Sequence, residues 1–392
     1  MQCLNATISP LLLATIDQSI EQERLSRKTL MEAVAELSRI FTKERHHLRP
    51  LYLDGTILGA AYRRYFLPVN LAKIQALLDE MPRPEPVERF SALDIGSGPG
   101  TGALAVLDWW HQRALPQTLS VTAVDASTAV LRQARWLWDQ YCHAAGVRGV
   151  DLQAYAGDLE RRAWLEQVRQ KAPFNLIMIA NCLNEFHNNA NDPIEARTDL
   201  MREALSLLAP HGTMMIVEPA LRETSRALHQ VRDRLLQERR CTVYSPCLHE
   251  LNCPALVKPD DWCHEERAWE PPVSILDIDE AVGFIKDALK FSYLLLRKDG
   301  KTIAERHSNV YRVVSELREL KGEKRAWLCN EQGRQEIGRQ DRLASPRNQA
   351  FDLWHRGAIV QIEEIVRKER RGKVSALGRI EQDAEVQIVR PV

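Results

Sequence analysis

Three glycines at alternate positions near residue 95 constrain the fold of this chain more than any other feature. They are Gly96, Gly98 and Gly100, and they follow directly on the apolar run at residues 92–95. Glycine lets the backbone turn tightly and approach a ligand closely, and the N-terminus of a following helix offers unpaired N–H groups. The spacing departs from the dinucleotide fingerprint G-x-G-x-x-G, because Thr101 stands where its last glycine would be. The segment predicts the first strand–loop–helix unit of a doubly wound α/β sheet.

Polar residues mark the end of this strand and of the next three. Asp94, two positions before the first glycine, suits an ammonium group, and Asp125 after the second strand suits the hydroxyls of a ribose. Asp158 follows the third strand, where it would meet an adenine amino group, and Asn181 ends the fourth strand. Carboxylates at these places repel a pyrophosphate but fit a zwitterion joined to a nucleoside. Together with the three glycines, these residues predict a site for S-adenosylmethionine.

Short apolar runs alternate with helical segments through the middle of the chain. Strands separated by helices are typical of a parallel sheet with right-handed crossovers. The helix before the fifth strand is predicted to be closed by Pro210–Gly212. Seven strands are predicted, at residues 92–95, 119–124, 152–155, 174–180, 213–217, 242–244 and 291–296.

The sequence divides into a helical N-terminal extension, the sheet domain with a cysteine-rich insertion, and a small β-rich C-terminal domain. The predicted bounds are residues 1–88, 89–298 with the insertion at 241–270, and 299–392. Apolar residues at three- and four-residue spacing between Ile16 and Phe41 indicate helix. From Arg297 onward there are 21 basic and 15 acidic residues, whereas the whole chain has 53 of each. The C-terminal domain is therefore the predicted basic part of a chain without net charge.

Five of the eight cysteines are unusual in their distribution: four crowd into one segment and the fifth stands further on. They are Cys241, Cys247, Cys253, Cys263 and Cys329. In a reducing compartment, clustered cysteines are more often metal ligands or catalytic groups than disulfide partners. Four thiolates, from Cys247, Cys253, Cys263 and Cys329, fit either zinc or an iron–sulfur cluster. His249 and His264 are rival ligands that favour zinc, and Cys241 is interpreted as a core residue.

The glycine loop and the acidic residues at the strand ends resemble the class I methyltransferase domain, over residues 88–300. The resemblance implies a Rossmann-like, seven-stranded, mostly parallel sheet with S-adenosylmethionine across its C-terminal edge. It supplies no catalytic residue. The segment Asn181–Phe186 lacks the Asn/Asp-Pro-Pro-Tyr/Phe motif that grips an amino group, and Cys182 lacks the preceding proline of pyrimidine C5 methyltransferases. Glu185 and His187 are candidate bases, with ordinary surface groups as the alternative.

The segments Pro246–Pro254 and Asp261–His264 with the distant Cys329 resemble a more specific family when they accompany the glycine loop. This family comprises the methyltransferase-like assembly factors of the mitochondrial small ribosomal subunit and their bacterial relatives, and the likeness spans residues 40–370. It implies that Cys247, Cys253, Cys263 and Cys329 bind a [4Fe–4S] cluster. It also implies association with the small ribosomal subunit and its rRNA.

Two groups of basic residues are candidates for contact with rRNA, although a solvated charged face is the alternative for each. The first is the run Arg367–Lys373, with arginines from the preceding part of the domain. These are Arg334, Arg339, Arg342 and Arg347. The second is the run Lys43–His47 with Arg63 and Arg64.

The chain is expected to be a cytoplasmic monomer that contacts no membrane. No apolar run approaches the length of about 18 residues that a membrane span needs, and the first residues lack the basic start of a signal peptide. Together with the family resemblance, the sequence predicts an assembly factor of the small ribosomal subunit that binds S-adenosylmethionine and a [4Fe–4S] cluster. If the protein is an enzyme, the predicted activity is methylation of rRNA. The alternatives are an active small-molecule or protein methyltransferase with structural zinc, and a catalytically silent RNA-binding module.

Overall fold

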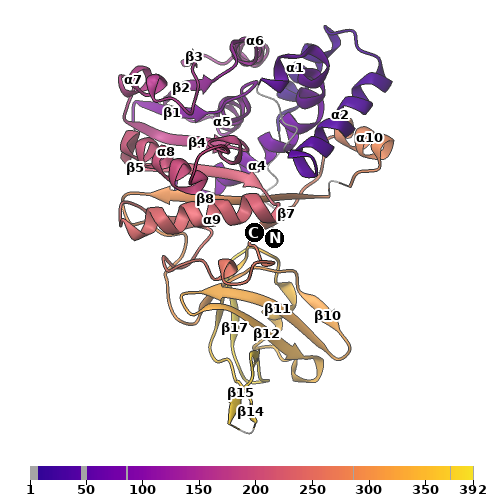
Figure 1. Cartoon of the computed structure of the whole chain (residues 1–392). Coiled ribbons are helices and arrows are strands. Elements are labelled where there is room, and N and C mark those ends of the chain that lie inside the picture. Colours follow the sequence, from indigo (N-terminus) through magenta and orange to yellow (C-terminus); the bar gives the residue numbers. More distant parts are fainter. Residues whose placement is uncertain (1–7, 46–50, 85–86, 286, 371, 392) are drawn as a thin grey trace. The chain divides into compact units, whose positions relative to one another are not determined.

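The computed structural model of the chain describes residues 8–45, 51–84, 87–285, 287–370 and 372–391 (Figure 1). By its internal contacts the chain divides into two units. Residues 4–221 and 268–289 form one, here called the sheet unit, and residues 222–267 and 290–392 form the other, here called the cysteine unit. Each unit draws on two separate stretches of the sequence.

Five parallel strands lie side by side in the sheet unit in the order β3-β2-β1-β4-β5 (Figure 1). Their central residues are apolar and buried, as expected for parallel strands covered on both faces. Because the order reverses between β1 and β4, the carboxyl ends of these two strands flank a crevice. The strands are β1 (Arg89–Ile95), β2 (Thr118–Asp125), β3 (Val150–Ala156), β4 (Phe174–Ala180) and β5 (Leu208–Pro219).

The fifth strand begins earlier than predicted. Pro210–Gly212, expected to close a helix, lies within β5. The register between β4 and β5 shifts between Phe174 and Leu176, so the extra residues form an irregularity of the ladder. A side chain at Gly212 would lie 2.9 Å from the backbone oxygen of Phe174, so the two strands approach too closely there for any other residue. The glycine therefore marks a close strand contact.

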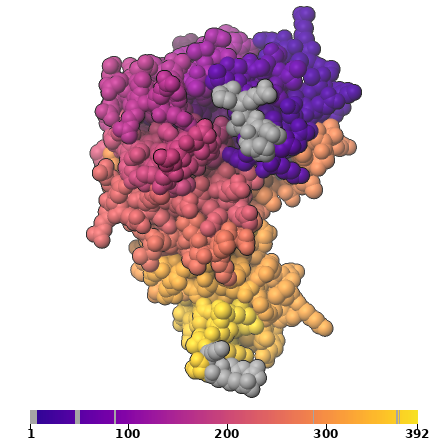
Figure 2. All heavy atoms as spheres, in the orientation of Figure 1, coloured from indigo at the N-terminus to yellow at the C-terminus, as the bar shows by residue number. Residues whose placement is uncertain are grey.

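Helices connect the parallel strands, and a group of N-terminal helices packs beside them. Contacts join α1 to α6 and α4 to α5, and in Figure 2 the indigo atoms of the N-terminal segment lie directly against the violet atoms that follow. The helices are α5 (Thr101–Gln112), α6 (Thr128–Ala145), α7 (Ala163–Arg169), α8 (Pro193–Leu207), α10 (Val273–Val282) and the short 3₁₀ turn η4 (Leu183–Glu185). The N-terminal elements are α1 (Pro10–Glu21), α2 (Arg27–Thr42), the 3₁₀ turn η2 (Tyr52–Asp54), α3 (Thr56–Ala61), the π-helical turn η3 (Tyr62–Phe66) and α4 (Leu67–Glu80).

The apolar positions between Ile16 and Phe41 belong to two helices. Arg24, between α1 and α2, has a left-handed backbone with φ 51°. Ser26 then caps α2, because its hydroxyl accepts a hydrogen bond from the backbone N–H of Thr29 at 3.1 Å. The local turn and cap stop a helix that the apolar periodicity alone would continue.

The cysteine unit begins with α9 (Arg222–Gln237) and contains two groups of strands. The predicted sixth and seventh strands are β6 (Thr242–Ser245) and β8 (Ala288–Arg297), which pair antiparallel, and β7 (Glu265–Ala268) pairs with β8. A second sheet has the order β16-β12-β11-β9-β13-β17, with β10 beside β11. Its strands are β9 (Val310–Val313), β10 (Arg318–Leu320), β11 (Glu323–Asn330), β12 (Gly333–Gln340), β13 (Ile359–Ile362), β16 (Leu377–Arg379) and β17 (Val386–Arg390). A separate hairpin consists of β14 (Glu369–Arg370) and β15 (Lys373–Val374). The unit also contains the 3₁₀ turns η5 (Pro254–Leu256), η6 (Asp341–Leu343) and η7 (Gln349–Leu353).

The predicted architecture is confirmed in its main features. The chain has the α/β class I methyltransferase-like arrangement of a parallel-rich sheet with helices, together with a β-rich C-terminal sheet. A core of its own fills the C-terminal sheet, around Val313, Leu328, Ile337, Phe351 and Val360. Every helix in the described part of the chain is too short or too polar to span a bilayer.

Candidate functional site

The buried carboxyl group of Asp94 fixes the glycine loop through hydrogen bonds. Its side chain is only 1% exposed, and Oδ2 accepts hydrogen bonds from the Ser97 hydroxyl at 2.7 Å and from the Ala103 N–H at 2.9 Å. A side chain at Gly102 would collide with this carboxyl group. Burial raises the pKa of Asp94 to about 6. The residue predicted to hold an ammonium group thus also caps the first turn of α5.

The three glycines of the loop differ in what surrounds them. All three have positive φ, which favours glycine. A side chain at Gly96 would lie 2.4 Å from the Cys182 sulfur, and one at Gly100 would lie 3.0 Å from the Ala134 side chain. A side chain at Gly98 would have no described atom within 4 Å beyond its chain neighbours. Gly96 and Gly100 therefore serve packing, whereas Gly98 leaves space into which a ligand can come.

Asp125, at the end of β2, faces this loop. Its Oδ2 accepts a hydrogen bond from the Gly98 N–H at 2.8 Å, and its Oδ1 accepts one from the Ser127 N–H at 2.9 Å. Burial raises the pKa of Asp125, and the nearby Asp54 raises it further. The Ser127 hydroxyl donates to Asp54. An acidic group from the N-terminal extension thus lies beside the carboxylate predicted to bind ribose.

Asp158 and Asn181 have different surroundings. Asp158 is exposed in the loop after β3, where it accepts a hydrogen bond from the Glu160 N–H at 3.0 Å and pairs with Arg161 at 3.2 Å. Asn181 directly follows β4 with φ 58°, and its N–H donates to the Val217 carbonyl at 2.7 Å. Both lie after the carboxyl ends of parallel strands, and their roles toward the cofactor remain predictions.

A buried polar network lies beyond the carboxyl ends of β4 and β5. Asn184 donates from its side chain to Glu218, and Arg45 donates to the Asn184 side-chain oxygen. Burial raises the pKa of Glu218 to about 7. Burial and then Glu218 raise the pKa of Glu185 to about 8. Neighbouring Cys182 is buried and donates to the Ile95 carbonyl, and burial raises its pKa so far that a thiolate nucleophile is disfavoured.

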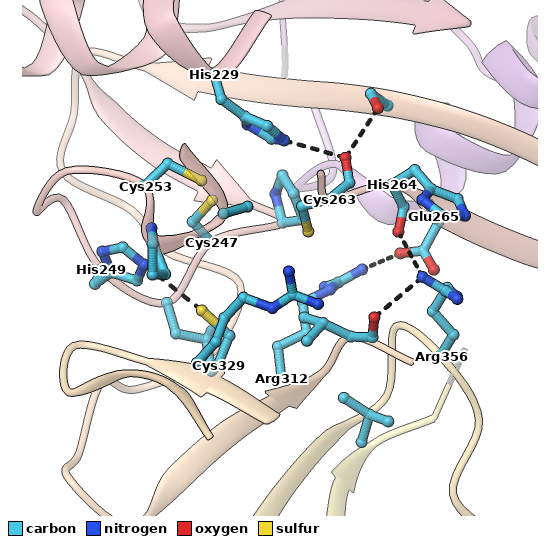
Figure 3. Close-up of a pocket in the computed structure, with 18 of the residues that line it drawn as sticks. His229, Cys247, His249, Cys253, Cys263, His264, Glu265, Arg312, Cys329 and Arg356 are labelled. Carbon is cyan, nitrogen blue, oxygen red and sulfur yellow. Dashed lines mark hydrogen bonds and ion pairs between the residues drawn. The ribbon is translucent and has the colours of Figure 1, made fainter. Parts of the chain in front are cut away.

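The four cysteines predicted as ligands line one cavity of the cysteine unit, with a volume of about 40 Å³ (Figure 3). Cys247 follows β6, Cys253 precedes η5, Cys263 precedes β7, and Cys329 lies in β11. Burial raises the pKa of Cys263 to about 11. Burial also raises the pKa of Cys253 and of Cys329, and repulsion from the neighbouring thiolates raises both further. Cys247 and Cys263 thus lie near both Cys253 and Cys329.

Both histidines named as rival ligands line the cavity, whereas Cys241 does not. His249 lines the cavity, and its Nε2 lies 3.8 Å from the Cys329 sulfur. His264 also lines it but forms a hydrogen bond between its Nε2 and Oε1 of Glu266 at 2.9 Å. Cys241 is buried and is not among the lining residues. In the part of the chain that the structure describes, no group of three or more His, Cys, Asp or Glu side chains is arranged to hold a metal ion.

Cationic side chains surround this cavity. The lining includes Arg312, Arg334 and Arg356, and of these Arg312 pairs with Glu265 and Arg334 with Asp261. Among the described residues, several buried nitrogen atoms here have no hydrogen-bond partner. They are the Nε of Arg334 and Arg356 and the Nδ1 of His229, His249 and His264. The cavity is thus rich in unsatisfied nitrogen groups beside sulfur.

Arg232, one turn before the end of α9, holds the loop that carries two of these cysteines. Its side chain is fully buried and donates to the carbonyl oxygens of Leu251 at 2.9 Å and His249 at 2.6 Å. Asp233 pairs with Arg232 and accepts the N–H of Cys253 at 2.9 Å. Burial alone would lower the pKa of Arg232, but the thiolate of Cys247 and the carboxylate of Asp233 raise it.

A family model described as "Mitochondrial small ribosomal subunit Rsm22" matches residues 57–339. The match covers more than half of the chain and includes both the glycine loop and the four cysteines. The chain belongs to this family. The predicted relation to a family of the mitochondrial small ribosomal subunit is therefore confirmed. No curated protein matches the chain in sequence.

Solved structures similar to this Rsm22-family chain are remote in sequence. The plantazolicin methyltransferase BpumL is 14% identical, with 72% of this chain and 99% of that chain covered and a TM-score of 0.34. A protein from Listeria monocytogenes described as a class I S-adenosylmethionine-dependent methyltransferase is 10% identical, with 74% and 87% covered and a TM-score of 0.40. The methyltransferase subunit of a type I restriction-modification system from Streptococcus thermophilus is 16% identical, with 71% and 56% covered and a TM-score of 0.35.

Several arginines predicted to face rRNA are engaged within the protein. Arg63 is 2% exposed and pairs with Glu23, and Arg64 pairs with Asp17. Arg339 is 3% exposed, and Arg334 lines the cysteine cavity. Arg63 and Arg339 are therefore not available as an RNA surface, and Arg64 and Arg334 have partners within the protein. Arg342 and Arg347 are exposed, whereas His46, His47 and Arg371 lie outside the described residues.

The sequence analysis missed residues that the fold brings to both places. Tyr52 and Asp54 come from the N-terminal extension, where no motif marked them, and burial followed by Glu185 raises the pKa of Tyr52. Arg232 lies on an amphipathic helix whose pattern does not single it out. Glu218 could have been found from the sequence, because it lies at the carboxyl end of a parallel strand, as Asp125 does. The rule that found Asp125 therefore also applies to the fifth strand.

Proposed function

We propose that this Rsm22-family protein binds S-adenosylmethionine and associates with the small ribosomal subunit and its rRNA. The single observation that carries the proposal is the family match over residues 57–339, since the family is described by that subunit. The rRNA is then the methyl acceptor that fits the partner. The proposal includes a [4Fe–4S] cluster on Cys247, Cys253, Cys263 and Cys329.

The glycine loop supports the cofactor part of the proposal. Gly98 has open space beside it, and Asp125 lies on its N–H at the carboxyl end of the neighbouring strand. A carboxylate in this position accepts the two hydroxyls of a ribose. The cofactor supplies an electrophilic methyl group on a sulfonium. The chain itself supplies the carboxylates of Asp94 and Asp125 and the N-terminus of α5.

Replacement of Asp125 by alanine is expected to weaken binding of S-adenosylmethionine by about 1–3 kcal/mol, because charge-assisted hydrogen bonds to the ribose are lost. Titration calorimetry measures this change. Asp151→Ala is the matched control, since that carboxylate is partly exposed at the start of β3 and pairs with Arg89. Equal affinities of the Asp125→Ala protein and the unchanged protein would contradict the assigned role.

The unsatisfied nitrogen groups around the cysteine cavity support the iron–sulfur part of the proposal. A cubane distributes its thiolate ligands over four iron atoms, and its sulfides accept hydrogen bonds. Buried donors that line the cavity, Arg334 Nε and Arg356 Nε, would then acquire acceptors, and the arginines would offset the negative charge.

Co-sedimentation with purified small ribosomal subunits tests the proposed partner. The protein is expected to pellet with the subunits through sucrose at both low and physiological salt, with weaker retention at the higher salt because contacts to phosphate are screened. Large ribosomal subunits at equal concentration are the control. Recovery of the protein only in the free fraction at both salt concentrations would defeat the proposal. A colourless preparation with one zinc per chain would leave the partner intact but defeat the cluster.

A further inference from the structure

Two carboxyl groups lie together where β4 and β5 end. Glu218 is the penultimate residue of β5, and Glu185 ends η4, directly after β4. Glu218 is 1% exposed, and Glu185 is half-buried. Ligands of open α/β sheets bind outside the carboxyl ends of the strands, so both groups lie on the ligand side of the sheet. Neither group takes part in the proposed binding of S-adenosylmethionine.

One oxygen of Glu218 has no partner. Its Oε2 accepts a hydrogen bond from Asn184, whereas Oε1 is fully buried and unpaired within the described residues. A buried acceptor without a donor is unfavourable unless a ligand or a proton satisfies it. No hydrogen bond to the Glu185 side chain is seen among the described residues either. The pair therefore presents acceptors on two different elements.

The neighbouring guanidinium groups do not fill these acceptors. Arg45 donates to the side-chain oxygen of Asn184, and Arg197 donates to the carbonyl oxygens of Asn184 at 3.1 Å and Phe186 at 2.9 Å. Both arginines thereby fix the segment that carries Glu185. They moderate the negative charge of the carboxyl groups without forming an ion pair to either among the described residues.

The carboxyl pair lies close to the predicted cofactor pocket. Asp125 and Glu218 both raise the pKa of Glu185, and Glu185 in turn raises the pKa of Tyr52. Cys182 also lies beside both glutamates, and it contacts the place where a side chain at Gly96 would be. Phe186 contacts the same place, at 3.7 Å, so the short segment that carries Glu185 lies against the glycine loop.

We propose that Glu185 and Glu218 form a subsite for the amino nitrogen of the methyl acceptor, which on the proposed function is an amino group of an RNA base. An amino group carries two N–H donors and can satisfy two carboxyl acceptors, whereas a hydroxyl group carries one donor. The pair takes the place of the Asn/Asp-Pro-Pro-Tyr/Phe motif, which grips an amino group in other methyltransferases and which the sequence lacks after β4. The inference rests on the proposed function, since it assumes S-adenosylmethionine in the adjacent pocket.

Calorimetry with three cofactor forms tests the subsite without requiring turnover. Sinefungin carries an amino group on a carbon in place of the methylated sulfur, S-adenosylmethionine carries a charged sulfonium without N–H at that place, and S-adenosylhomocysteine carries neither. The unchanged protein is expected to bind sinefungin about tenfold more tightly than S-adenosylhomocysteine. Glu218→Gln and Glu185→Gln are each expected to reduce this preference about fivefold while changing the affinity for S-adenosylhomocysteine less than about twofold.

Glu166→Gln is the matched control, because that side chain is exposed on α7. A preference that survives in both variants, or is absent from the unchanged protein, would overturn the subsite. Equal losses for sinefungin and S-adenosylmethionine would also overturn it, because stabilisation of a sulfonium charge needs no N–H. Failure of the unchanged protein to bind any of the three compounds would instead remove the proposed cofactor, and the subsite with it.

Discussion

Replacement of Cys329 by alanine is expected to remove the iron from the protein. Three of the four proposed ligands come from the stretch between β6 and β7, and Cys329 alone comes from β11 of the C-terminal sheet. With three thiolates left, one iron site of the cubane has no protein ligand, and the cluster loses its attachment to that sheet. Iron and sulfide content after anaerobic purification should fall at least about tenfold, and absorbance near about 400 nm should disappear.

Cys241→Ala is the matched control for this prediction. Cys241 is as buried as Cys253, each with 6% of its surface exposed, but it does not line the cavity. The Cys241→Ala protein should therefore keep its iron. This comparison distinguishes the loss of a cluster ligand from the loss of any buried thiol. Iron retained in Cys329→Ala, or lost equally in both variants, would contradict the assigned ligand set. If only the Cys241→Ala protein loses iron, Cys241 is the ligand in place of Cys329.

The strands of the sheet unit could be predicted because their signals are local. Apolar runs such as those of β1 and β4 are short and continuous, and their polar end residues mark where each strand stops. The failures have local causes as well. Pro210–Gly212 has the composition of a turn, yet it lies in β5 because the ladder with β4 accommodates an irregularity there. The break between α1 and α2 depends on one left-handed residue, Arg24, which is not a glycine.

The candidate site was predictable only where function and local sequence coincide. The crowded cysteines are visible in the sequence, and all four proposed ligands line one cavity. Burial of charged side chains is not visible there, because it depends on tertiary packing. Arg63 and Arg339 belong to arginine-rich groups that predict a basic surface, but both side chains are buried and pair with acidic residues. Tyr52 and Glu218 reach the cofactor side only through the fold of the N-terminal extension and the order of the strands.

Replacement of Arg232 by leucine is expected to lower the free energy of unfolding by about 3–5 kcal/mol, since it removes one partner from a buried ion pair. Asp233 and two backbone carbonyls of the 247–253 loop would lose their donor. The prediction applies to the metal-free protein, so it does not depend on the cluster. Urea denaturation measures the change, and hydrogen exchange at the Cys253 amide reports it locally, because Asp233 accepts that N–H.

Arg240→Leu is the matched control, which tests whether the loss of any arginine near the end of α9 lowers the free energy of unfolding. Its side chain is 65% exposed and pairs with Glu238 at 3.4 Å, so its replacement should change the free energy of unfolding by no more than about 0.5 kcal/mol. If both variants unfold at the same urea concentration as the unchanged protein, Arg232 does not hold the loop. If the Arg232→Leu protein unfolds early while exchange at Cys253 stays slow, the residue stabilises α9 alone. The expected combination, early unfolding with fast exchange at Cys253, makes the arginine the group that keeps two of the four thiols at the cavity before any metal arrives.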